Sequence, residues 1–166
     1  MKNAYQSKRL FWHNLKNFDK PNIPVYGTDE IIVAGFELVL CDSNCHPKNI
    51  FVPVNSDNES QMCYETENDN ISSICGKRTK IFGNIVHSIL NEISELTYNM
   101  DKCKRLPAYP KLGFVNFYAL GRKGKFGKIF TYPEIHFSEH PYYPVYIYFT
   151  QLINEIRKVA IEKLGL

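Results

Sequence analysis

Residues Gly113 to His140 read GFVNFYALGRKGKFGKIFTYPEIHFSEH and contain the clearest pair of strands in the chain. On both sides of the basic turn GRKGK, residues 121–125, the segments are rich in aromatic and aliphatic residues interleaved with polar ones. Such segments are typical of strands with a buried face, and a short glycine-containing turn between them predicts an antiparallel hairpin. This hairpin determines the class of fold, because the remaining strands and helices have to pack around it.

A second pair of strands is predicted earlier in the chain. The run IIVAGFELVL lies between Glu30 and Cys41, and a shorter run covers residues 50–54. The turn between them predicts another antiparallel hairpin. Pro53 has no backbone N–H, which favours an edge position for the second run. Residues 55–79 are polar and acidic with little periodicity, so we expect a long surface loop there.

Helical periodicity marks the segments between and after the strands. Apolar residues recur every three or four positions from Phe82 to Met100, and again from Pro144 up to Gly165, which predicts two amphipathic helices. A shorter pattern predicts an N-terminal helix or arm over residues 1–20.

The order of these elements predicts an α+β fold. We expect an antiparallel sheet of about four strands, with the two main helices packed on one face and a short N-terminal helix. The chain has 166 residues, of which 44% are hydrophobic, and this is enough for one packed core. Residues 1–166 are therefore expected to form a single domain.

Net charge and cysteine content restrict the class of protein. The chain carries 20 Lys and Arg against 17 Asp and Glu, an excess too small to require a polyanionic partner. No apolar run approaches the roughly 20 residues of a transmembrane helix, and the N-terminus lacks the apolar core of a signal peptide. The five cysteines are then expected to be reduced thiols. We expect a cytoplasmic protein without a transmembrane segment.

The basic turn is the strongest candidate for a binding surface. Its cations could neutralise phosphates, and nearby aromatic rings could stack bases at about 1 to 3 kcal/mol each. The leading hypothesis is a small binding protein that contacts nucleic acid and performs no chemistry of its own. The alternative is a solvated turn above an ordinary core face. The candidate residues are Arg122, Lys123, Lys125, Lys128, Tyr118, Phe126, Phe130 and Tyr132.

A second candidate site contains Glu134, His136, Glu139 and His140. On a helix, His136, Glu139 and His140 would fit the inverted zinc-protease pattern, but Pro141 leaves little room for one. On a strand, Glu134 and His136 would share one side and could act as an acid-base pair or as metal ligands. A metal-dependent hydrolase or nuclease is the catalytic alternative, and histidines that merely mark a strand end are the ordinary one.

Zinc is also a hypothesis for the cysteines. Cys41, Cys45 and His46 are close in sequence, whereas Cys63 and Cys75 follow in the polar segment. Structural zinc sites usually offer two tight pairs, and only the first pair is tight here. Free thiols without a cofactor are the alternative.

The remaining hypothesis is a protein-interaction or assembly component. The many tyrosines near the C-terminal helix and the amphipathic N-terminus would suit a protein partner or self-association into a homo-oligomer. Abundant Asn, Lys, Ile and Tyr are typical of AT-rich genes, so a phage or mobile-element accessory factor fits this hypothesis. No phosphate-binding loop, dinucleotide fingerprint or nucleophile elbow is present, so the positive case for an enzyme is weak.

Overall fold

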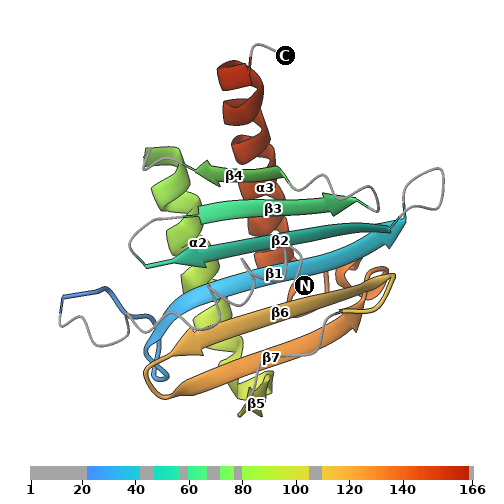
Figure 1. The fold of residues 1–166 in the computed structure, drawn as a ribbon. Helices are drawn as coiled ribbons and strands as arrows, with labels where there is room; N and C mark the ends of the chain where they lie inside the picture. Colours follow the sequence, from blue (N-terminus) through green and yellow to red (C-terminus); the bar gives the residue numbers. More distant parts are fainter. Residues whose placement is uncertain are drawn as a thin grey trace.

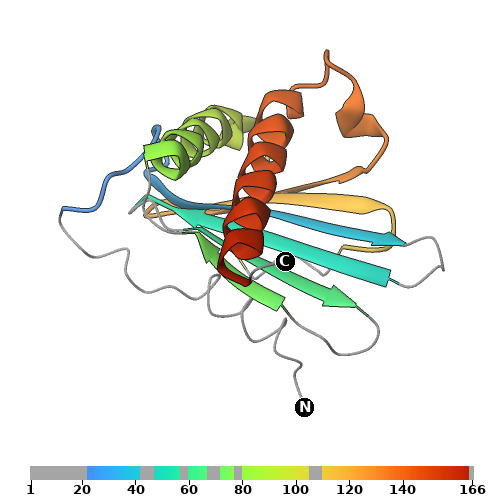
Figure 2. The same cartoon turned by 90° about the horizontal axis from the view of Figure 1, so that it is seen from above.

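The computed structural model describes residues 22–41, 47–56, 60–66, 72–76, 80–104 and 110–164. They form one antiparallel sheet in the order β4-β3-β2-β1-β6-β7-β5, with helices α2 and α3 on one face (Figures 1 and 2). This arrangement confirms the α+β class. The strands are β1 (Ile31–Cys41), β2 (Pro47–Asn55), β3 (Ser60–Thr66), β4 (Ser72–Gly76), β5 (Asp101–Cys103), β6 (Phe114–Gly121) and β7 (Gly124–Thr131).

The sheet has seven strands, so the expected number of about four was too low. Two of the additional strands, β3 and β4, lie in residues 55–79, where the prediction of a long loop was wrong. Their sequences, SQMCYET and SSICG, lack the apolar alternation that marks a strand. They extend the sheet by backbone pairing with β2 and with each other, which leaves little signal in the side-chain pattern.

The two main helices lie close to their predicted positions. Helix α2 spans Lys80–Leu96 and is followed by a 3₁₀ turn, η2 (Thr97–Asn99). At Met100 the backbone becomes extended, and the chain enters β5 instead of continuing the helix as expected. Helix α3 spans Tyr143–Leu164, as predicted. The predicted helix or arm over residues 1–20 lies outside the described residues.

Neither of these helices combines the length and the apolar character needed to span a bilayer.

Aromatic packing joins the helices to the centre of the sheet. Phe36 on β1 pairs with Phe117 on β6, and their ring centroids are 5.5 Å apart. The ring of Phe149 on α3 stacks on Phe36 at 5.4 Å. We call this side the helix-facing side. Its buried sheet residues include Ala34, Leu38, Val52, Val54, Val115, Ala119 and Phe126.

The opposite side of the sheet, which we call the distal face, also contains buried residues. Phe51, Tyr118 and Leu120 alternate with the helix-facing residues of the same strands and have at most 1% exposure. Both sides of the central strands are therefore buried. This explains why the run IIVAGFELVL is almost continuously apolar, since strict alternation is expected only where one side faces water.

Pro53 occupies an interior strand and not the expected sheet edge. Strand β2 lies between β1 and β3, and Pro53 pairs with Gly35 on β1. The pairing of β2 with β3 includes Phe51 and Val54 but omits the two residues between them. A gap in the ladder therefore accommodates the missing N–H of the proline.

Candidate functional site

The basic turn between β6 and β7 is fixed against residues 26–30. The backbone N–H of Arg122 donates to the carbonyl of Glu30 at 3.2 Å, and that of Lys123 reaches the carbonyl of Asp29 at 3.5 Å. The ammonium group of Lys123 also donates to the carbonyl of Thr28 at 2.7 Å. The tip of the hairpin is thus held by two backbone hydrogen bonds and one from the Lys123 side chain.

Residues 26–30 are in turn attached to helix α2 and to the turn η2 that follows it. The hydroxyl of Thr97 donates to the carboxylate of Asp29 at 2.7 Å. Gly27 has a φ of +66°, and an added Cβ would lie 2.9 Å from the Cβ of Ser94. A glycine is therefore required at this position both by the left-handed backbone and by the close approach to α2. These contacts therefore fix the position of residues 26–30 and of the basic turn bound to them.

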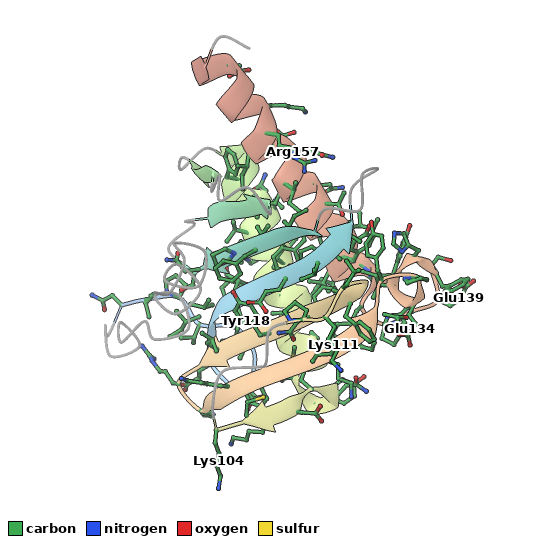
Figure 3. The ribbon with its side chains drawn as sticks, turned by 45° about the vertical axis from the view of Figure 1, so that its right-hand side comes forward. Lys104, Lys111, Tyr118, Glu134, Glu139 and Arg157 are labelled. Carbon is green, nitrogen blue, oxygen red and sulfur yellow. The ribbon has the colours of Figure 1, made fainter. Side chains whose placement is uncertain are left out.

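Cations concentrate where β5, β7 and the basic turn meet. Strand β5 pairs with β7, so residues 101–104 lie beside residues 121–131. These two segments contain six of the 20 Lys and Arg but only one of the 17 Asp and Glu, so the rest of the chain carries a net negative charge. Figure 3 shows Lys104 projecting from this edge. We call the cluster the basic edge: Lys102, Lys104, Arg122, Lys123, Lys125 and Lys128.

The cations of the basic edge lie on both sides of the sheet. Lys102 pairs with Phe126, and its ammonium lies 6.0 Å from that ring centroid on the helix-facing side. Lys128 pairs with Phe117 and belongs to the same side. Lys125 pairs with Cys103 and belongs to the distal face. The positive charge therefore surrounds the edge of the sheet instead of covering one flat surface.

The aromatic residues predicted to stack bases are largely buried. Tyr118 is fully buried on the distal face, and Phe126 is 7% exposed on the helix-facing side. Phe130 and Tyr132 are half-buried and pack against the core. These rings stabilise the fold and do not form an open stacking surface. The predicted contact with nucleic acid remains a hypothesis, which now rests on the cations.

Glu134 belongs to a 3₁₀ turn, η3 (Glu134–His136), and not to a strand or a long helix. Its carboxylate accepts hydrogen bonds from the backbone N–H and the hydroxyl of Thr131, both at 2.6 Å. These two bonds lower the pKa of Glu134. The carboxylate therefore fixes the turn after β7, while Glu139 lies exposed further along the same loop (Figure 3).

His136 is held between two groups of the protein. Its Nδ1 lies 2.7 Å from the carbonyl of Tyr132, and its Nε2 lies 3.2 Å from the hydroxyl of Tyr146. A carbonyl only accepts, so Nδ1 carries a proton and donates to Tyr132, while Nε2 pairs with the tyrosine hydroxyl. The ring of His140 meets Phe130 edge-on at 4.6 Å, and its Nδ1 accepts from the N–H of Tyr142. Both histidines make contacts that order the loop.

The predicted metal ligands do not converge in the described part of the chain. There, no three His, Cys, Asp or Glu side chains are close enough to hold a metal ion. Glu134, His136, Glu139 and His140 have the separate surroundings described above. The structure does not describe the side chains of Cys41, Cys45, His46, Cys63 and Cys75, so the hypothesis that they bind zinc stays a prediction.

A buried polar pair on the distal face was not predicted from the sequence. Glu37 on β1 and Asn116 on β6 are directly paired and fully buried. The side-chain amide of Asn116 donates to the Glu37 carboxylate at 3.1 Å. No donor among the described residues reaches the Oδ1 atom of Asn116. A glutamate within IIVAGFELVL and an asparagine within FVNFYAL were the sequence signals, because each interrupts an apolar strand.

A pocket of about 290 Å³ lies next to this pair, and we call it the distal pocket. Gly127 on β7 leaves space between Tyr118 on β6 and Asp101 on β5, with which it is paired. The short strand β5 forms one wall. The lining residues are Asp101, Cys103, Asn116, Gly127, Lys128 and Ile129. The pocket thus joins the buried polar pair to the basic edge.

Comparison with known proteins gives no family for this chain: no protein-family model matches it, and no curated protein shows significant similarity. Its function has to be argued from its own residues.

Proposed function

We propose that this chain is a small non-catalytic binding protein whose basic edge contacts the phosphates of single-stranded nucleic acid. The observation that carries the proposal is the concentration of positive charge in residues 101–104 and 121–131, two segments that fold together at one edge of the sheet. The net charge of the whole chain is +3, but these two segments hold six cations and one acidic residue while the rest of the chain is net negative, so the charge is strongly concentrated at this edge.

The available contacts favour binding through the phosphate backbone. Lys102 and Lys104 are exposed, and no described carboxylate forms an ion pair with either of them or with Lys128. Tyr118 and Phe126 are buried, so stacking on these rings does not support the proposal. Contacts to phosphates depend little on base sequence. We therefore expect binding with weak sequence preference and a strong dependence on salt.

A flexible single strand suits this geometry better than a duplex. The cations lie on both sides of the sheet edge, with Lys102 on the helix-facing side and Lys125 on the distal face. A single strand can bend around such an edge, whereas a short duplex is stiff and bending it costs free energy.

The proposal is tested by binding of fluorescent oligothymidylate at about 50 and 200 mM salt. The variant Lys102→Gln with Lys104→Gln removes two cations from the basic edge. The control Arg157→Gln with Lys158→Gln removes the same charge from α3. Figure 3 shows Arg157 at the opposite end of the molecule from Lys104. We expect the first variant to reduce the slope of log K against log salt by about 1.4, since each phosphate contact to a single strand contributes about 0.7.

Equal weakening by the two variants would show that overall charge, and not the basic edge, controls binding. Wild-type protein that shows no salt-sensitive binding to any single strand would contradict the proposal itself. Recovery of a stable homo-oligomer by mass measurement would instead favour the assembly hypothesis. Tyr142 gives that hypothesis little support, because it is buried and not available to a partner.

A further inference from the structure

Tyr98 presents an open aromatic ring next to the basic edge. It belongs to the turn η2 between α2 and β5, and it is 84% exposed. Single exposed aromatic residues are common on protein surfaces, so exposure by itself assigns no role. Tyr98 differs from an ordinary surface residue in two respects, which are the fixed position of its backbone and the charge around its side chain.

Hydrogen bonds hold the residues on both sides of Tyr98. The hydroxyl of Thr97 donates to the carboxylate of Asp29 at 2.7 Å. The side-chain oxygen of Asn99 accepts a hydrogen bond from the hydroxyl of the buried Tyr142 at 3.4 Å. The backbone that carries the ring is therefore ordered before anything binds, and this order lowers the entropic cost of binding.

Tyr98 lies on the same side of the sheet as two cations of the basic edge. The turn η2 continues helix α2, which covers the helix-facing side (Figure 2), and Lys102 and Lys128 project from that same side. Lys102 follows Tyr98 by four residues, so their Cα atoms are at most about 14 Å apart. Lys128 is two residues from Phe130, whose ring packs on Tyr142 at 4.7 Å. After burial itself, the nearby Tyr98 is the next cause of the raised pKa of Tyr142.

An open ring beside cations matches one nucleotide of a single strand. The face of a base can stack on the ring, while the phosphates on either side of that base meet the ammonium groups. A second exposed ring, that of Phe137, has different surroundings. It is 66% exposed in the loop that contains Glu134 and Glu139, whose carboxylates repel phosphates. Tyr98 therefore combines the two features that binding of a single strand requires, whereas Phe137 has only one of them.

We propose that Tyr98 is the stacking platform for one base of the single strand, while Lys102 and Lys128 hold the neighbouring phosphates. This inference rests on the proposed function, because it adds a base contact to the basic edge. Every base has a face that can stack, so the ring increases affinity without creating a preference for sequence. It takes the place of Tyr118 and Phe126, which are buried.

The test compares oligothymidylate with an abasic oligomer of the same length, which has the same phosphates but no bases. Wild-type protein is expected to bind oligothymidylate at least about fivefold more tightly, the lower end of the effect of one stacked base. Tyr98→Ala should abolish this difference, whereas Tyr98→Trp keeps a stacking ring and should retain it. Because stacking releases no counterions, Tyr98→Ala should leave the slope of log K against log salt unchanged.

Phe137→Ala is the matched control, because it removes an exposed ring from a loop that is not part of the basic edge. Loss of the difference in this variant as well would overturn the assignment to Tyr98. Equal affinities of the wild-type protein for the two oligomers, with salt-sensitive binding of both, would overturn the stacking platform and leave the phosphate contact standing. No salt-sensitive binding of either oligomer would overturn both proposals.

Photocrosslinking of the wild-type protein gives a readout that needs no substitution. An oligothymidylate with one 5-iododeoxyuridine can form a crosslink to an aromatic ring that stacks on the iodinated base. We expect peptide mass spectrometry to place this crosslink on Tyr98. Crosslinks confined to other residues would overturn the stacking platform.

Discussion

The aromatic ring of Tyr118 lies directly against Gly35, its pairing partner across β1 and β6. An added Cβ on Gly35 would be 1.7 Å from the Cζ atom of that ring. Phe51 stacks on the same tyrosine, with centroids 6.1 Å apart. The tyrosine therefore cannot move toward β2 to make room, and the glycine is needed for packing on the distal face.

Gly35→Ala is expected to lower the free energy of unfolding by about 1 to 3 kcal/mol, the usual cost of overpacking a core. Urea denaturation followed by circular dichroism measures this change. Gly124→Ala is the matched control, because the nearest atom there is the flexible Cε of Lys102 at 2.8 Å. A similar loss in both variants would mean that the Tyr118 contact is not the cause.

Asn116→Leu is expected to destabilise the protein by about 1 to 3 kcal/mol, because it removes a donor from the buried carboxylate of Glu37. Urea denaturation is again the measurement. In a double-mutant cycle, Glu37→Leu combined with Asn116→Leu should cost less than the sum of the single changes. Strict additivity would show that the two side chains do not stabilise each other.

Alkaline pH is expected to weaken the fold through Tyr146. Burial, and then the hydrogen bond with Tyr132, raises the pKa of Tyr146 to about 12, and burial also raises the pKa of Tyr142. The unfolded chain loses these protons near its ordinary pKa of about 10, while the folded chain keeps them. Stability should therefore be complete below about pH 10 and fall as pH rises toward 12.

The measurement is the urea midpoint at a series of alkaline pH values. Tyr146→Phe should lose less stability over that interval than the wild type. An absorbance titration in which every tyrosine of the folded protein ionises near its ordinary value would contradict the assignment.

Thr131→Ala is expected to raise the pKa of Glu134 toward its ordinary value, because the hydroxyl hydrogen bond is the main cause of the lowered pKa. A carboxylate with a lowered pKa stabilises the folded state above the unfolded pKa, and this contribution disappears as the pH falls through the folded pKa. Carbon-detected NMR titration follows the carboxylate directly. Thr131→Ser keeps the hydroxyl and should leave the pKa low.

Periodicity predicted the elements that bury apolar side chains. The hairpin of β6 and β7 and the helices α2 and α3 appear where the pattern placed them, because each buries side chains on the helix-facing side. Strands β3 and β4 could not be found in this way, since their sequences carry no such pattern. Strand β5 was missed because its three residues, which begin just after Met100, are too few to show alternation.

The candidate site was predicted in part. The sequence placed cations at the turn, but it could not reveal that Lys102 and Lys104 join them, because pairing of β5 with β7 is a tertiary contact. Alternation along a strand also assigns residues to its two sides, but it does not show whether one side or both sides are buried in the folded protein. Tyr118 and Phe126 were therefore expected in the open, although they lie on opposite sides and are both buried.

The pairing of β1 with β6 has a consequence for the speed of folding. Glu37 and Asn116 meet at the centre of the sheet although they are 79 positions apart in sequence. The meander from β1 to β4 and the hairpin of β6 and β7 can each form from nearby residues, whereas their union requires closure of a long loop. Docking of β6 onto β1 is therefore expected to limit the folding rate. During synthesis, the apolar edge of β1 stays unpaired until β6 has left the ribosome, and this interval is when the chain is most exposed to aggregation.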